Sequence, residues 1–97
     1  MQVHGLICPS CGEFIYSCAT HDFRYCGCGK LSIDGGQRYF KFGWDPSISK
    51  DDIKHVTIEV DATQSELYDD WNQSLRKKRK YGRILPKDLK KILLYNG

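Results

Sequence analysis

Two closely spaced cysteine pairs are the residues best suited to chemistry. The first pair is Cys8-Pro-Ser-Cys11, and the second is Cys26-Gly-Cys28, which begins after fourteen intervening residues. A glycine follows each pair and lets the backbone turn tightly, so that amides can point at the sulfurs. Four thiolates supplied by two such loops suit the tetrahedral preference of zinc. The spacing therefore predicts a zinc ribbon with Cys8, Cys11, Cys26 and Cys28 as ligands.

Other uses of these cysteines stay open in the sequence. A thioredoxin-like redox pair needs Cys8 and Cys11 at the start of a helix, whereas the segment after them has a strand-like pattern. Rubredoxin-like iron would also accept four thiolates. The fifth cysteine, Cys18, is expected to be a small buried strand residue. Alternatively, Cys18 or His21 replaces one ligand of the tighter second pair.

A zinc ion bound by four cysteines has no open position for water or substrate, which is typical of a structural site. Three polar residues near the cysteine loops, His21, Asp22 and Asp34, are the alternative acid and base set. Asp34 before two glycines is more typical of a turn, and His21-Asp22 of a hydrogen-bonded corner. We therefore expect structural zinc, no catalytic residues and no enzymatic activity.

A run of bases, RKKRKYGR at residues 76–83, is the second strong feature. One interpretation is a solvated helix end favoured by the helix macrodipole. The functional interpretation is a surface for phosphate groups, because Lys and Arg gain affinity by releasing counterions from nucleic acid, and tyrosines add stacking. The candidate binding residues are Arg76, Lys77, Lys78, Arg79, Lys80, Tyr81 and Arg83, with Tyr39 and Lys41 on the ribbon.

Two classes of partner fit this surface about equally well. Nucleic acid is favoured by the bases and, through fold analogy, by the frequent use of zinc ribbons as nucleic-acid modules. An acidic surface on a host protein would match the same bases. Neither a membrane nor a small-molecule substrate is expected, since no apolar run approaches the ~20 residues of a membrane span.

Short strands must position the cysteine loops. Alternating patterns and turn residues predict strands at Glu13–Cys18, Lys30–Ile33 and Gln37–Trp44. Asp34-Gly35-Gly36 lies between the last two and predicts a hairpin turn. After a polar connector at 45–54, the alternation of Val56, Ile58 and Val60 predicts another strand, which we expect to join or extend the sheet.

The rest of the chain has a helical period. Thr63 and Glu66 form a capping-box pattern, and a stripe of Leu67, Trp71 and Leu75 predicts a helix to about Lys80 that packs on the sheet. Pro86 predicts the start of a short second helix. Its apolar face is made by Leu85, Leu89, Ile92 and Leu93.

Composition and charge bound the whole chain. The 97 residues suit one small α+β domain, with a zinc ribbon at 1–44 and a strand plus two helices at 55–97. Residues 1–75 carry 6 Lys and Arg against 11 Asp and Glu, a net −5, whereas residues 76–97 carry 9 against 1, a net +8. With no signal-peptide pattern, we expect a reducing cytoplasm, where paired cysteines are more often metal ligands than disulfides.

The order CPxCG, HDF, CxCG and IDGG resembles a small zinc-ribbon family found in bacteriophages and bacteria. The matching residues are Cys8, Cys11, Gly12, His21, Asp22, Phe23, Cys26, Cys28, Gly29, Ile33, Asp34, Gly35 and Gly36. This resemblance covers about residues 6–44. It implies a zinc-ribbon fold and a phage-encoded protein, and it implies no mechanism. We expect a regulator or inhibitor that acts through its basic helix on nucleic acid or a nucleic-acid-processing machine, or alternatively one that binds a host defence or transcription complex directly.

Overall fold

Ten elements make up the part of the chain that the computed structural model describes. It describes residues 1–73, 75, 76 and 78–96, with side chains up to residue 92. The order of elements is β1 (Gln2–Ile7), β2 (Phe14–Ile15), β3 (Arg24–Tyr25), β4 (Leu31–Asp34), β5 (Lys41–Trp44), a 3-10 turn (Lys50–Asp52), β6 (Lys54–Glu59), α1 (Gln64–Asn72), β7 (Arg83–Ile84) and α2 (Pro86–Asn96).

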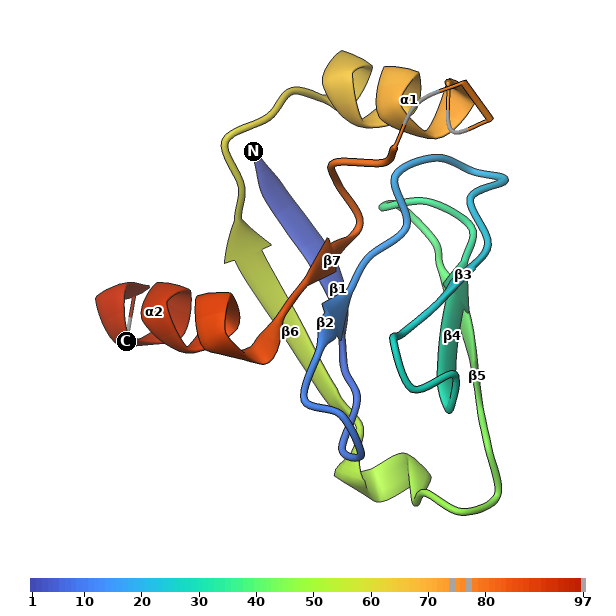
Figure 1. The fold of residues 1–97 in the computed structure, drawn as a ribbon, viewed down its shortest axis with the longest axis vertical. Helices are drawn as coiled ribbons and strands as arrows, with labels where there is room; N and C mark the ends of the chain where they lie inside the picture. The colour runs from blue at the N-terminus through green and yellow to red at the C-terminus, as the bar shows by residue number, and fades with distance from the viewer. Residues whose placement is uncertain (74, 77, 97) are drawn as a thin grey trace.

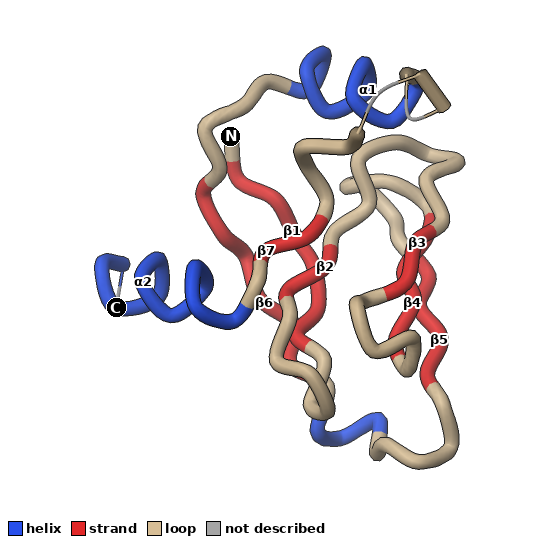
Figure 2. The backbone as a smooth tube through the Cα atoms, in the orientation of Figure 1, coloured by secondary structure: helices blue, strands red, loops and turns tan. Residues whose placement is uncertain are grey.

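Two antiparallel sheets stand side by side, with the helices placed around them (Figure 1). The larger sheet has the strand order β6-β1-β2-β7, and the smaller has the order β3-β4-β5. Figure 2 shows α1 across one end of the sheets and α2 at the side of the larger sheet, near β6 and β7. The small α+β fold expected from the sequence is therefore confirmed. None of the helices in the described residues is long and apolar enough to cross a membrane.

The larger sheet joins the two halves of the chain. β1 pairs with β6 along its whole length, from Gln2 opposite Glu59 to Ile7 opposite Lys54. β2 pairs with β7, so the basic end of the chain contacts the segment that follows the first cysteine pair. The expectation that the strand of Val56 and Ile58 joins a sheet is confirmed, although its partner β1 was not predicted.

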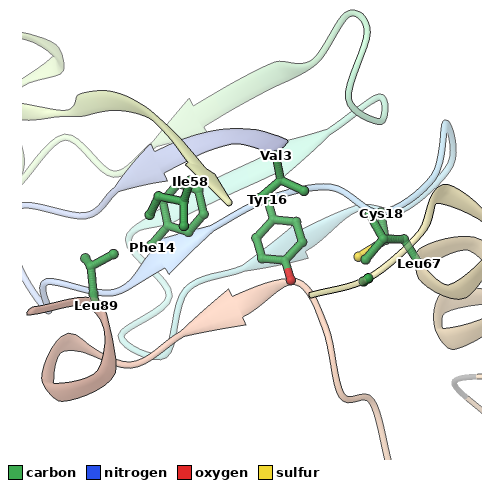
Figure 3. Packing of buried hydrophobic residues seen from close by; sticks show 8 residues of the cluster. Val3, Phe14, Tyr16, Cys18, Ile58, Leu67 and Leu89 are labelled. Atoms are coloured by element: carbon green, nitrogen blue, oxygen red, sulfur yellow. The ribbon is translucent and has the colours of Figure 1, made fainter. Parts of the chain in front are cut away.

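The core has two clusters of buried side chains. The first lies between the larger sheet and the two helices, where Figure 3 shows Ile58 against Phe14 and Cys18 beside Leu67. The second contains Leu6, Ile15, Leu31, Ile33, Ile53 and two of the paired cysteines, Cys8 and Cys26. The candidate metal centre is thus continuous with the hydrophobic core and not a surface appendage.

Helix α1 begins as predicted but ends early. The Thr63 hydroxyl accepts the Glu66 amide, and the Glu66 side chain accepts the Thr63 amide, which completes the capping box. The helix ends at Asn72, so the prediction of a helix to about Lys80, and with it a basic helix, is wrong. Leu75 is fully exposed instead of packed on the sheet. The reason is tertiary: the side chain of Asp70 captures the backbone of the following segment, as described below.

Other boundaries differ in smaller ways. The predicted strand Glu13–Cys18 shrinks to Phe14–Ile15, and Gln37–Trp44 shrinks to Lys41–Trp44. Residues 36–39 form the turn instead, with Gly35 and Gly36 at φ of +103° and +83°. The second helix begins at Pro86 as predicted, with Leu89 buried, Ile92 half-buried and Leu85 partly exposed. The predicted contact of Leu93 lies outside the described side chains.

Candidate metal centre and basic hollow

The four paired cysteines meet at one point. Their Sγ atoms all lie within 4.8 Å of one another. The Sγ of Cys28 is 3.7 Å from that of Cys8 and 3.4 Å from that of Cys26. A tetrahedral zinc ion with Zn–S bonds of ~2.3 Å needs sulfurs ~3.8 Å apart. The donor set and its spacing therefore fit a zinc ion, and the four cysteines stand in a zinc-binding arrangement.

Two similar turns deliver the sulfurs. In the first, the Gly12 amide donates to the carbonyl of Cys8 over 2.8 Å, and Gly12 has a φ of +77°. In the second, the Gly29 amide donates to the carbonyl of Cys26 over 3.0 Å, and Gly29 has a φ of +76°. Positive φ is costly for residues other than glycine, so the glycine after each pair is needed to close its turn.

The four thiols differ in environment. Cys8 and Cys26 are buried, Cys11 is half-buried and Cys28 is exposed. Burial raises the pKa of Cys11 to about 12. Burial acts in the same direction on Cys28, but hydrogen bonds from the Lys30 amide and the neighbouring thiols outweigh it and lower its pKa to about 7. A divalent cation binds thiolates and must displace the protons of these four thiols, so we expect metal binding to weaken at low pH.

A buried carboxylate, Glu13, ties the two cysteine loops together. Its side chain accepts the amide of Gly27, lies 3.8 Å from the Sγ of Cys11, and pairs with Arg83 of β7 at 3.6 Å. A Cβ atom on residue 27 would come within 2.7 Å of the Glu13 carboxylate, which explains the glycine inside the second pair. Sequence reasoning missed Glu13, because a single acid beside a cysteine loop gives no distinctive signal.

The remaining polar candidates lie elsewhere. Cys18 is fully buried in the first core cluster, and burial raises the pKa of its thiol to about 12. His21 is exposed, and neither residue belongs to the cysteine cluster. Asp34 is half-buried opposite Lys41 in the sheet register, as a turn-forming residue would be. Asp22 is buried and has a structural partner in the basic segment.

Arg79 is that partner, and it lies between two buried acids. Its guanidinium donates to both oxygens of Asp22, at 2.8 and 2.9 Å, and its Nε donates to Asp70 at 3.4 Å. Asp22 is 1% exposed and Asp70 is 6% exposed. Burial alone would raise the pKa of Asp22, but hydrogen bonds from Arg79 and from the Cys18 amide hold it below its usual value. Arg79, one of the candidate binding residues, is therefore paired with two acids of the fold.

Asp70 also fixes the backbone that follows. It accepts the amides of Lys80 at 2.8 Å and Tyr81 at 3.0 Å. Residues 78–81, which we call the strap, are thus held against the body and belong to neither a helix nor a strand. Within the described residues, Lys78, Arg79 and Lys80 of the basic run therefore lie on an irregular segment and not on a helix.

The strap forms one side of a concavity, which we call the basic hollow. Its volume is about 590 Å³. It is lined by Arg24, Lys78, Arg79, Lys80, Tyr81, Arg83, Ile84, Leu85, Asp88 and Ile92. Among the predicted binding residues, Arg76 is exposed outside this lining, and Tyr39 and Lys41 are exposed on the ribbon away from it. Lys77 lies outside the described residues. Arg24 was missed, because a lone arginine in the ribbon carries no pattern.

Comparison with known proteins locates the similarity in the cysteine-rich part. Residues 5–44 match a family model described as a domain of unknown function, DUF7695. No curated protein and no solved structure matches the chain. The matched region contains both cysteine pairs and ends before the strap. Over residues 5–44 the chain is therefore similar to a family without an assigned activity, and the basic hollow combines that region with the C-terminal part.

Proposed function

We propose that the protein is a non-enzymatic nucleic-acid-binding module built on a structural zinc ribbon. The observation that carries this proposal is the basic hollow, where four bases other than Arg79 line one concavity together with a single acid, Asp88. Arg79 forms ion pairs with buried acids and so anchors the strap without any bound ligand. Its exposed neighbours Lys78 and Lys80 are therefore held in place and remain available to bind.

The proposed zinc ion acts as a staple. Four thiolates fill a tetrahedral shell and leave no position for a substrate, so they support structure and no chemistry. A chain of 97 residues has a small core, and the cysteine loops connect that core to both sheets. Zinc is proposed over iron because the four-cysteine, two-loop arrangement is its commonest structural site.

The charge of the hollow sets the expected mode of binding. Each phosphate neutralised by a Lys or Arg releases counterions, so affinity falls with salt, with a slope of roughly −0.7 per contact for single strands. Three to four contacts in the hollow therefore predict a slope of roughly −2 to −3 in the plot of log affinity against log salt concentration. Tyr81 adds an aromatic surface on which a base can stack.

Fluorescence anisotropy with labelled single-stranded DNA, RNA and duplex DNA tests this proposal. We expect binding at low salt that weakens with the stated slope, and at least tenfold weaker binding by the double variant Lys78→Gln, Lys80→Gln. The matched control is Lys50→Gln, Lys54→Gln, which removes two exposed lysines outside the hollow. If no nucleic acid binds at low salt, or if both double variants bind equally, the proposal is wrong.

A second candidate is a phage-encoded inhibitor that binds a host protein directly. It is supported by large exposed aromatic side chains on the ribbon, where Phe23 and Tyr25 are each more than half exposed and Tyr39 is 83% exposed. Affinity purification from host lysate distinguishes the candidates. The second candidate predicts one stoichiometric protein that is lost from the Phe23→Ala, Tyr25→Ala variant and kept by Lys78→Gln, Lys80→Gln. Recovery that depends on the lysines and is abolished by nuclease would contradict it.

A further inference from the structure

Arg24 is a half-buried base without an ion-pair partner among the described residues. Its Nη1 donates to the carbonyl of Tyr81 at 2.7 Å. Its Nε is buried without a hydrogen-bond partner, and within the described part of the chain no carboxylate forms an ion pair with it. Burying a charged group without a paired opposite charge is costly, and a bound anion would offset that cost.

The guanidinium of Arg24 occupies the space that a side chain at position 82 would fill. Gly82 has a φ of +104°, and a Cβ atom there would lie only 1.4 Å from the Nη1 of Arg24. The next residue, Arg83, is a second base nearby, although it pairs with Glu13 at 3.6 Å. Burial is the main cause that lowers the pKa of Arg24, and repulsion from Arg79 adds to it, while attraction from Asp22 opposes both. The position beneath the strap is therefore rich in bases, and none of the ion pairs in the described residues involves Arg24.

The size and walls of the basic hollow indicate which anion would fit. A volume of about 590 Å³ is within the range of ~300–1,000 Å³ typical of small-molecule sites. Its lining combines the bases with one aromatic residue, Tyr81, and three aliphatic residues, Ile84, Leu85 and Ile92. A single carboxylate or an internal phosphodiester brings only one negative charge, whereas a terminal phosphate carries roughly −1.5 to −2 at pH 7 and three acceptor oxygens.

We infer that the basic hollow is a site for a terminal phosphate monoester, at the end of a nucleic acid or on a nucleotide, with Arg24 as its main counter-charge. The exposed Lys78 and Lys80 supply further positive charge, and the aromatic and aliphatic residues of the lining accommodate the sugar and base. This inference rests on the proposed function and deepens it: the module distinguishes the ends of nucleic acids from their interior.

The test uses the zinc-loaded full chain and two oligonucleotides of one sequence, one with a 5′-phosphate and one with a 5′-hydroxyl. We expect the phosphorylated strand to bind at least fivefold more tightly. Arg24→Gln should remove this preference, whereas Arg38→Gln, which replaces an exposed arginine outside the hollow, should retain it. If Arg24→Gln fails to fold, the variant Lys78→Gln, at an exposed position, is used in its place. It should at least halve the preference for the phosphorylated strand.

Nuclear magnetic resonance of arginine side chains provides a readout without any variant. Titration with inorganic phosphate, and then with a nucleoside 5′-monophosphate, should shift the Nε–H resonance of Arg24 while chloride at equal ionic strength does not. If the nucleotide shifts the Arg24 resonance but the two strands bind equally, the ligand is a nucleotide. If the phosphorylated strand binds more tightly, the ligand is the end of a nucleic acid.

The outcomes separate the inference from the proposed function. Equal affinity for the two strands, with the Arg24 resonance unmoved by phosphate, would overturn the terminal-phosphate site while nucleic-acid binding stands. Failure of both strands to bind, with an Arg24 shift on adding nucleotide, would overturn the proposed function and leave the site. A shift of the same size with chloride would overturn the inference.

Discussion

Replacing Arg79 by glutamine should destabilise the protein far more than replacing any exposed base. The substitution leaves the carboxylates of Asp22 and Asp70 buried without their cation and removes three hydrogen bonds to charged groups. Breaking a buried ion pair by removing one partner costs about 3–5 kcal/mol. Total stabilities of small domains are about 5–15 kcal/mol, so Arg79→Gln should lose a large share of the free energy of unfolding.

Urea unfolding of the zinc-loaded protein, followed by circular dichroism at pH 7, measures this loss. The matched control is Arg76→Gln, a fully comparable change at an exposed position, which should alter the free energy of unfolding by less than about 0.5 kcal/mol. At about 4–8 °C per kcal/mol, the melting temperature of Arg79→Gln should fall by at least about 12 °C.

The pH dependence has a definite sign. Because the pKa of Asp22 is lowered in the folded state, its contribution is present above the unfolded value of ~3.9 and is lost as the pH falls through the folded value. The stability difference between the wild type and Arg79→Gln should therefore be constant from pH 6 to 8. A loss below 0.5 kcal/mol at pH 7, or a difference that changes within this window, would refute the proposed anchor.

Four further substitutions and one chelation test follow from the structure. A strong chelator should abolish the near-ultraviolet circular dichroism signal of the ribbon. In elemental analysis, Cys26→Ser should hold no metal, whereas Cys18→Ala should keep one metal per chain. Equal metal content of these two variants would contradict the ligand set. Gly82→Ala should cost at least about 1 kcal/mol in urea unfolding, because it displaces Arg24, and an unchanged stability would show that the space is not needed. Glu13→Gln should keep the metal but release it faster to a chelator, since it weakens the bond to the second cysteine loop; an unchanged rate would remove that role.

Local signals in the sequence predicted the features that depend on neighbouring residues. The spacing of the cysteine pairs, the glycine after each pair, the capping box at Thr63 and the helix start at Pro86 all reside within a few residues, and the structure has each of them. Such features are fixed by backbone geometry and short hydrogen bonds, which is why one sequence is enough to find them.

Contacts between distant residues account for what was missed. Arg79 meets Asp22 across 57 positions, and Arg24 meets Tyr81 across the same separation. The helical stripe that continues to Leu75 was overridden, because Asp70 accepts amides from the strap once the chain folds back. The run of bases thus identified the charged segment, but only the fold shows that Arg79 is an anchor and that Lys78 and Lys80 stay exposed.

The central claim is that a closed metal site holds the ribbon while the basic hollow carries the function. X-ray absorption at the zinc edge of the purified protein tests its structural half most directly. The account predicts one zinc per chain, surrounded by four sulfurs at ~2.3 Å with no nitrogen or oxygen neighbour. A shell that contains water, carboxylate or histidine, or a protein that holds no metal, would contradict it.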